Sequence, residues 1–187
     1  PAAVTYVERY QPDLVGYLTP VCSPMVAHAR HIKAELGPDT HVIFIGPCVA
    51  KKAEAERPEN EAAVDCVLTF RELVQWLDQE GILLAECEES GFDEQPEGDA
   101  RFFPLEGGSL RTASLDADLL ATENVSVSGA EAVHEALESL RNDPAPVVIE
   151  PLFCPHGCVG GPAIPREANL YDRRREVLGY ATRNPGV

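Results

Sequence analysis

The stretch HVIFIGPC, residues 41–48, shows the pattern on which the fold prediction rests. Its β-branched and aromatic residues predict a short buried strand over His41–Ile45, and the Gly-Pro pair behind that strand predicts a turn. Cys48 follows the turn directly. The stretch VVIEPLFC, residues 147–154, repeats this order, because a predicted strand ends just before Cys154. The two cysteines therefore hold matching places behind two different strands.

Predicted helices alternate with such strands along the chain. Residues 23–37, SPMVAHARHIKAELG, predict a helix that Ser23 caps at its N-terminus. Residues 63–70, AVDCVLTF, predict another strand, and Thr69 is the expected cap of the helix behind it. This alternation predicts an α/β fold of mostly parallel β-sheets flanked by helices, in which sites form at the carboxyl ends of strands. The two cysteines lie at that end.

We expect one domain over residues 1–187, built from two lobes. The lobe around 22–80 carries the first cysteine motif, and the lobe around 101–165 carries the second. A C-terminal helix is predicted within 166–187. Between the lobes, residues 86–100 are acidic and rich in turn-forming residues, which predicts a solvated loop.

The charge balance limits the partners that the chain can have. The sequence holds 31 acidic and 15 basic residues, for a net charge of −16. Such a surface repels phosphate groups, so we expect neither nucleic acid nor an anionic membrane as a partner. A basic redox or protein partner is compatible with it. No apolar run reaches the roughly 20 residues of a membrane-spanning helix.

The six cysteines indicate the redox compartment. They are too few for a disulfide scaffold in a chain of 187 residues. The first residues, PAAVTYVERY, lack the basic and apolar regions of a signal peptide. We therefore expect a reducing compartment, the cytoplasm, in which some thiols are core residues and others are metal ligands.

The second cysteine motif, PLFCPHGCVGGP, leaves four interpretations open. Cys154 and Cys158 lie four residues apart, which suits a metal clamp, a disulfide, a redox pair or two free thiols on a tight turn. Gly157, Gly160 and Gly161 would let the backbone approach a bulky iron–sulfur cluster without Cβ clashes. Their amides are also candidate donors to cluster sulfurs.

The first cysteine motif offers a third thiolate. Cys48 is followed by Lys51 and Lys52, and a nearby ammonium group lowers a thiol pKa and can donate to an anionic ligand. The alternative is that these lysines begin a solvated helix with charged side chains at helical spacing. Cys22, just before a helix, is a candidate fourth ligand, whereas Cys66 in the middle of a predicted strand is expected in the core.

Three further side chains are candidate proton carriers. Glu54 and Glu150 could relay protons, although most glutamates in this chain are expected to be solvated. His156 lies on the second cysteine motif, but a loop histidine beside glycine is more often neither a ligand nor a proton carrier.

Together these residues resemble the catalytic domain of iron-only (FeFe) hydrogenases and their hydrogenase-like relatives. The family motif Pro-Cys-x-x-Lys-x-x-Glu stands here at 47–54. The motif Glu-x-Met-x-Cys-x-x-Gly-Cys-x-x-Gly-Gly-Gly-Gln-Pro begins at Glu150, and its order is kept to Gly161. The segment VDCVLTFREL, 64–73, and the Ser-Pro pair at Ser23 also match, and the resemblance covers about residues 1–165.

The resemblance implies a ligand set and a cluster site between the two lobes. In that family four cysteines hold a 4Fe–4S cluster, and one of them bridges to a diiron unit that carries CO and cyanide. Cys48 and Cys154 resemble the cubane ligands, and Cys158 resembles the bridging cysteine. Lys51 resembles the lysine that hydrogen-bonds a diiron cyanide, and Ser23 is counted with the cofactor-binding residues.

The fourth ligand is expected outside these residues. The family's first motif ends in Cys-Pro before a segment like AAVTYVERYQPDL, so Pro1 resembles that proline and the cysteine is expected upstream of it. Cys22 is then a weaker candidate. Three thiolates leave one iron of a cubane without a protein ligand, so we expect the cluster to be incomplete or absent in this chain alone.

Five departures from the family pattern lie at positions that line its diiron pocket. The Gly-Gly-Gly-Gln-Pro ending is GGPAIP at 160–165, and the two motif methionines are Gly46 and Leu152. The Gln after Ser-Pro is Met25, and the segment FGxTGGVMEAALR is FPLEGGSLR at 103–111. These departures count against a diiron subcluster.

The departures favour redox or hydrogen sensing, or electron transfer, over hydrogen turnover. In the family, domains of this sensory kind accompany ferredoxin-like and signalling modules, so we expect such modules in the same longer polypeptide or a separate redox partner. A catalytically active FeFe hydrogenase and a structural zinc or thiol site are the alternatives.

Overall fold

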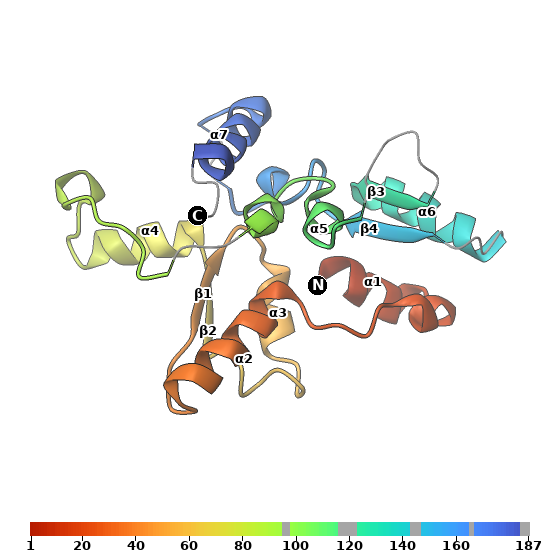
Figure 1. Ribbon diagram of the computed structural model, residues 1–187, viewed down its shortest axis with the longest axis horizontal. Helices are drawn as coiled ribbons and strands as arrows, with labels where there is room; N and C mark the ends of the chain where they lie inside the picture. The colour runs from red at the N-terminus through yellow and green to blue at the C-terminus, as the bar shows by residue number, and fades with distance from the viewer. Residues whose placement is uncertain (95–97, 116–122, 143–146, 165–166, 184–187) are drawn as a thin grey trace. The chain divides into compact units, whose positions relative to one another are not determined.

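The computed structural model describes residues 1–94, 98–115, 123–142, 147–164 and 167–183 (Figure 1). The α-helices and strands in these residues are α1 Ala2–Tyr10, α2 Pro24–Leu36, β1 Ile43–Gly46, α3 Ala50–Ala55, β2 Cys66–Thr69, α4 Phe70–Gln79, α5 Gly108–Thr112, β3 Asn124–Ser128, α6 Ala130–Asn142, β4 Val148–Leu152 and α7 Leu170–Arg183. Short 3-10 helices are η1 Pro12–Tyr17, η2 Leu84–Glu86, η3 Gly98–Phe102 and η4 Cys158–Gly160.

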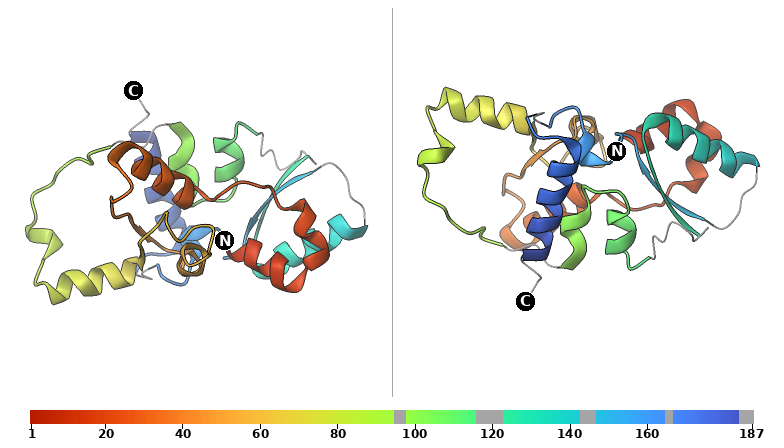
Figure 2. Two further views of the ribbon diagram at one scale, coloured as in Figure 1. Left: turned by 90° about the horizontal axis from the view of Figure 1, so that it is seen from below. Right: turned by 90° about the horizontal axis from the view of Figure 1, so that it is seen from above.

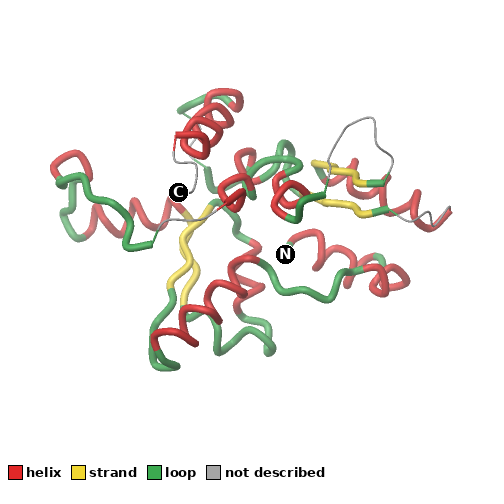
Figure 3. Tube along the Cα trace, in the orientation of Figure 1, coloured by secondary structure: helices red, strands yellow, loops and turns green. Residues whose placement is uncertain are grey.

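The chain divides into two compact units. Unit 1 comprises Pro1–Leu84 with Pro162–Pro165, and unit 2 comprises Ala85–Gly161 with Arg166–Val187. Each unit contains one two-stranded parallel sheet, β1 with β2 in unit 1 and β3 with β4 in unit 2. Figure 3 shows the two strand pairs and the helices around each of them. Among the described residues, no helix is long and apolar enough to cross a membrane.

In unit 1 the helix α2 covers one face of the β1–β2 pair. The Ser23 hydroxyl accepts a hydrogen bond from the Val26 amide at 3.4 Å, and a proline occupies the first helical position. Gly37, at φ 104°, ends the helix. The buried residues of this core come from α2, from β2 and from the residues just before β2: Met25, Val26, Ala29, Ala63, Val64 and Val67.

Unit 2 contains two packed regions. The helix α6 follows β3 through Gly129 and buries Val133 and Leu137. A second cluster joins α7 to the loops of the unit, and its buried members are Phe102, Leu105, Val159 and Ala181. Figure 2 shows α6 running along the β3–β4 pair in both further views.

The α/β prediction with parallel strands is confirmed, and so are the two helix caps Ser23 and Thr69. Strand β1 starts at Ile43, two residues later than predicted. The reason is that the Val42 amide donates to the Asp65 carboxylate at 2.7 Å instead of to a neighbouring strand.

The prediction that Cys66 lies in the core is wrong. Cys66 opens β2 and pairs with Ile43, and both side chains are exposed, whereas Phe44 and Val67 in the next pair face α2. Side chains alternate between the two faces of a strand, so a shift of one position decides which face a residue takes. The predicted C-terminal helix is α7, and residues 165–166 and 184–187 of that part of the chain lie outside the described residues.

Candidate functional site: two cysteine motifs behind parallel strands

The two cysteine motifs begin at equivalent points of the two units. Strand β1 ends at Gly46 and β4 ends at Leu152, so Cys48 and Cys154 each lie two residues beyond the carboxyl end of a parallel strand. Both cysteines are partly buried. The sequence therefore predicted their local placement correctly, because a strand followed by a turn fixes the residue behind it.

In unit 1, Lys51 is the lysine that points inward. Its ammonium group donates to the Glu54 carboxylate at 2.7 Å, and both side chains are only 12% exposed. The same ammonium group lies 5.9 Å from the centroid of the Phe44 ring. The pair uses one of the three donors of the lysine, so the group can still donate to a second anion.

Lys52 has a structural role. Its ammonium group donates to Glu72 at 2.5 Å, and this salt bridge joins α3 to the first turn of α4. Glu72 also forms a capping box with Thr69, and the pKa of Glu72 is lowered to about 2, first by Lys52 and then by the Thr69 amide and hydroxyl. The sequence could not separate the two lysines, because both are near Cys48 in the chain.

A family methionine is replaced in unit 1 by Gly46 beside an aromatic ring. A Cβ atom at Gly46 would lie 2.7 Å from the ring of Phe44, so that ring fills the space that a side chain at this position would take. The Phe44 side chain, in the same strand as Gly46, therefore occupies the space that the family methionine would need.

In unit 2, the loop from Cys154 to Gly160 is here called the thiol loop. Hydrogen bonds from its backbone amides to neighbouring segments hold it in place. The Cys158 amide donates to the Pro104 carbonyl at 2.9 Å, and the His156 amide donates to the Ser128 hydroxyl at 3.1 Å. His156 and Gly157 have φ values of 62° and 77°, a conformation that glycine adopts readily and that other residues rarely adopt. The exposed His156 is thus a turn residue of this loop.

Two glycines of the thiol loop lie too close to backbone oxygens to carry a side chain. A Cβ atom at Gly160 would lie 1.9 Å from the Pro155 carbonyl oxygen, and one at Gly157 would lie 2.8 Å from the Pro104 carbonyl oxygen. Close packing of the loop on itself and on Pro104 therefore requires both glycines. The three amides that the sequence offered to cluster sulfurs, those of Gly157, Gly160 and Gly161, donate to backbone carbonyl oxygens of the same loop.

Glu150 is buried in unit 2, and both of its carboxylate oxygens accept hydrogen bonds. It is 6% exposed, and one carboxylate oxygen accepts from the Gly107 amide at 2.6 Å and the Ser126 hydroxyl at 2.5 Å. The other oxygen accepts from the Ser109 amide at 2.6 Å. All three donors hold the carboxylate in place, so the structure gives Glu150 an organising role in unit 2.

The segment Pro104–Ser109 thus links the buried glutamate to the thiol loop. Its first residue accepts from Cys158, and its last residues donate to Glu150. The helix α7 adds a further contact, because the Arg173 guanidinium donates to the Val159 carbonyl at 2.7 Å. The thiol loop is therefore held in position by contacts inside unit 2.

The remaining cysteines and Ser23 have other surroundings. Ser23 caps α2, and the thiols of Cys22, Cys66 and Cys87 are exposed. Within the described residues, no group of three or more His, Cys, Asp or Glu side chains is arranged to hold a metal ion. Cys48 belongs to unit 1, and the other two motif cysteines belong to unit 2.

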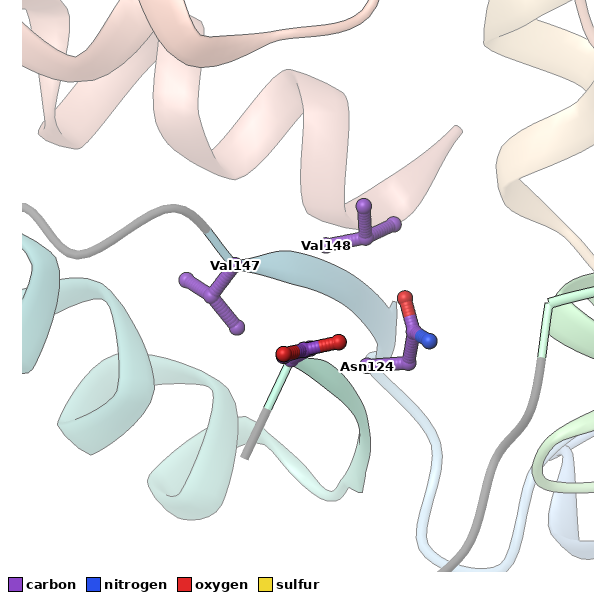
Figure 4. A pocket seen from close by; sticks show the side chains of 4 residues that line it. Asn124, Val147 and Val148 are labelled. Carbon is purple, nitrogen blue, oxygen red and sulfur yellow. The ribbon is translucent and has the colours of Figure 1, made fainter. Parts of the chain in front are cut away.

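An open depression lies at the other end of the β3–β4 pair. Its lining residues are Glu123, Asn124, Val147 and Val148 (Figure 4). They lie at the amino ends of the two strands, whereas Cys154 follows the carboxyl end of β4. This depression therefore contains no predicted site residue.

The structure is thus that of an α/β protein with two parallel strand pairs. A partly buried cysteine follows the carboxyl end of one strand in each pair. The family model described as the iron only hydrogenase large subunit, C-terminal domain, matches residues 1–162. The chain belongs to this family and is a hydrogenase-like domain. The predicted resemblance is confirmed.

Relatives of known name cover different parts of the chain. The periplasmic Fe hydrogenase large subunit of Nitratidesulfovibrio vulgaris is 26% identical over 216 residues, which cover 90% of this chain and 51% of that protein. The cytosolic Fe-S cluster assembly factor NAR1 of Kluyveromyces lactis is 38% identical over 77 residues, 41% of this chain and 16% of that protein. The chain thus spans about half or less of the length of these relatives.

A solved structure shows the same fold. A variant of an FeFe hydrogenase from Chlamydomonas reinhardtii matches with a TM-score of 0.75 and 20% sequence identity. The match covers 95% of this chain and 64% of that one. At this identity the likeness supports the architecture alone.

Proposed function

We propose that the chain is an iron–sulfur-binding hydrogenase-like domain that serves redox or hydrogen sensing, or electron transfer. Cys48, Cys154 and Cys158 are the proposed protein ligands of a 4Fe–4S cluster, with a fourth cysteine expected upstream of Pro1. The observation that carries this proposal is the pair of partly buried cysteines at equivalent strand ends in a member of this family.

The donor set suits the proposed cofactor. Thiolates are the usual ligands of iron–sulfur clusters, and a cluster of this kind supplies one-electron transfer when it is bound. The thiol loop presents Cys158 from a backbone that is already fixed by Pro104, so little ordering is needed on binding. Lys51 brings a positive charge to the helix behind Cys48, which favours an anionic ligand there.

Sensing or electron transfer is proposed over hydrogen turnover because both glutamates that are candidate proton carriers already hold hydrogen-bond or ion-pair partners. Glu150 accepts three hydrogen bonds, and Glu54 holds Lys51 in a largely buried pair. The departures from the family motifs at Gly46, Leu152 and 160–165 point the same way.

A test starts from a longer chain that includes the residues before Pro1. Anaerobic reconstitution with iron and sulfide is followed by metal and sulfide analysis and by electron paramagnetic resonance of the reduced protein. We expect iron and acid-labile sulfide in equal amounts, with a signal that disappears in Cys154→Ser and persists in Cys66→Ser, whose thiol is exposed. Absence of a cluster in this longer chain would contradict the proposal, and zinc in its place would favour the structural-site alternative.

A catalytically active FeFe hydrogenase is the second candidate, because Lys51 and Cys158 are retained. After maturation with a diiron unit, such an enzyme would evolve hydrogen from reduced viologen and show CO and cyanide bands in its infrared spectrum. We expect neither. Both together would replace sensing by catalysis as the function of the domain.

We also propose a redox partner or attached ferredoxin-like and signalling modules, and the cytoplasm as the compartment. The support is the acidic composition, with its net charge of −16, and the six cysteines, which are too few for a disulfide scaffold. The names of the relatives include one periplasmic and one cytosolic protein, so the compartment is proposed from the thiols and the sequence alone.

A further inference from the structure

The helix α7 holds the thiol loop at the residue next to Cys158. The Arg173 guanidinium donates through Nη1 to the Val159 carbonyl at 2.7 Å, and its Nε makes a longer contact of 3.5 Å with the Asn169 carbonyl. Within the described residues, this guanidinium forms no ion pair with a carboxylate. The positive charge of Arg173 is thus held by backbone oxygens, one of which belongs to the thiol loop.

Arg173 belongs to the face of α7 that packs on unit 2. Leu170 and Val177 lie three residues before it and four residues after it, so the three side chains share one side of the helix. Both apolar side chains pack against the buried cluster that contains Val159, which is 5% exposed. The hydrogen bond from Arg173 therefore forms at the border of a packed contact between α7 and the thiol loop.

The two arginines that follow in α7 have other surroundings. Arg174 is exposed. The side chain of Arg175 is 76% exposed and forms an ion pair with Asp172 at 2.9 Å. Of these three consecutive arginines, all of which the structure describes, only Arg173 donates a hydrogen bond to the thiol loop. The helix therefore contains a matched control for Arg173, because Arg174 has the same charge and the next place in the sequence.

The backbone around Cys158 is fixed from two directions. Its own amide donates to the Pro104 carbonyl at 2.9 Å, and the carbonyl of the next residue, Val159, accepts from Arg173. The first contact joins two uncharged peptide groups, whereas the second has a charged donor and is of the stronger kind. The position of Cys158 therefore depends on α7 as well as on the segment that begins at Pro104.

The charge of Arg173 lies close to a proposed cluster ligand. One peptide unit separates the Cys158 Cα from the Val159 carbonyl, so the donating nitrogen of Arg173 lies within about 9 Å of that Cα. A reduced iron–sulfur cluster carries one more negative charge than the oxidised cluster, and the charge around a cluster is one of the quantities that set its reduction potential. A partly buried positive charge at this distance stabilises the reduced state more than the oxidised state.

We propose that Arg173 is a positioning residue for Cys158, and that its charge favours the reduced form of a cluster held by that thiolate. The inference rests on the proposed function, because its second half needs a cluster at Cys158. Reduction takes one electron from an external donor, and no bond to Cys158 breaks. By thermodynamic linkage, the same interaction holds α7 more tightly on the thiol loop when the cluster is reduced, so the docking of α7 responds to the redox state.

The positioning role is tested in the longer chain before iron and sulfide are added. Hydrogen exchange of the Cys158 amide, followed by nuclear magnetic resonance, measures how firmly the loop is held on Pro104. We expect exchange to be about tenfold faster in Arg173→Met, because a hydrogen bond from a charged donor is lost, and unchanged in Arg174→Met. Equal exchange in the parent and both variants would overturn the positioning role, and so would equal acceleration in both variants.

The effect of the charge is tested in the same chain after anaerobic reconstitution. A redox titration followed by electron paramagnetic resonance gives the midpoint potential of the cluster. We expect Arg173→Met to shift the one-electron equilibrium about threefold toward the oxidised form, which corresponds to a potential about 28 mV lower. Arg173→Lys keeps the charge and should restore most of this shift, and Arg174→Met should match the parent. Circular dichroism checks that the variants keep the helix content of the parent.

The two measurements separate this inference from the proposed function. A parent chain that binds no cluster refutes the proposed function and the redox half of the inference, while amide exchange still decides whether Arg173 positions Cys158. A cluster that forms normally and has the same potential in the parent and in Arg173→Met refutes the redox half and leaves the proposed function standing. An equal shift in Arg174→Met would assign the effect to the general charge of α7, which also overturns the inference.

Discussion

The cysteine of unit 1 and the first cysteine of unit 2 occupy the same place behind a strand, but different forces hold their surroundings. Behind Cys48 the chain enters a helix whose inward side chain, Lys51, is fixed by an ion pair with Glu54. Behind Cys154 the chain forms a loop held by backbone hydrogen bonds and, through the segment 104–109, by buried Glu150. Side-chain chemistry therefore organises the first motif, and backbone geometry organises the second.

The largest difference is expected at the glycines of the two motifs. Gly160→Ala sets a Cβ against a backbone oxygen that cannot move, and we expect a loss of at least about 4 kcal/mol in the free energy of unfolding. Gly46→Ala meets only the ring of Phe44, which can turn, so about 1 kcal/mol is expected. Urea unfolding of both variants measures this. Equal losses would contradict the distinction between the two motifs.

The next effect concerns the buried carboxylate of unit 2. Glu150→Gln removes the negative charge that accepts hydrogen bonds from the Gly107 and Ser109 amides. We therefore expect a loss of about 3 kcal/mol in unfolding free energy. The same change should make the Cys158 thiol react faster with a disulfide reagent, because the segment 104–109 that holds its amide is loosened. Glu135→Gln, at an exposed position of α6, is the control and should change neither quantity.

A smaller effect is expected from the ion pairs of unit 1. Lys51→Met leaves Glu54 largely buried without its partner, and we expect a loss of about 2 kcal/mol in unfolding free energy. Lys52→Met removes a pair with both side chains about 40% exposed, so a much smaller loss than that of Lys51→Met is expected. A double-mutant cycle of Lys51→Met with Glu54→Gln isolates the coupling. A larger loss for Lys52→Met would reverse the assignment of the inward lysine.

The smallest effect is the loss of stability of unit 1 at low pH. The pKa of Asp65 is lowered to about 2, chiefly by the Val42 amide and then by Lys33, and the pKa of Glu72 is also lowered to about 2. Each carboxylate adds stability above its unfolded pKa, near 4, and that stability is lost as the pH falls from there toward 2. In Asp65→Asn, the free energy of unfolding should decrease less between pH 4 and 2 than it does in the parent. Asp78→Asn, with an exposed side chain, should leave the unfolding profile between pH 5 and 2 unchanged.

Local patterns in the sequence predicted the parts of the structure that depend on neighbours in the chain. Ser23 and Thr69 cap helices as predicted, and the order of strand, turn and cysteine placed Cys48 and Cys154 correctly. Each of these depends on residues within one or two turns of the chain, so spacing and residue type were sufficient.

The contacts that organise the motifs join residues far apart in sequence and could not be predicted in this way. Glu150 binds amides 43 and 41 residues away, and Cys158 donates to Pro104. The exposure of Cys66 depends on its register with β1, which the sequence of β2 alone does not contain. Such pairings depend on how the whole chain packs.

Cys48, Cys154 and Cys158 are the proposed ligands of one iron–sulfur cluster. The most direct measurement is the iron bound per chain after anaerobic reconstitution of a longer chain that includes the upstream cysteine, compared with its serine variants. We expect about four iron atoms per chain in the parent and in Cys66→Ser, and a strong loss in Cys48→Ser, Cys154→Ser and Cys158→Ser. Equal iron in all of these variants, or none in the parent, would contradict it.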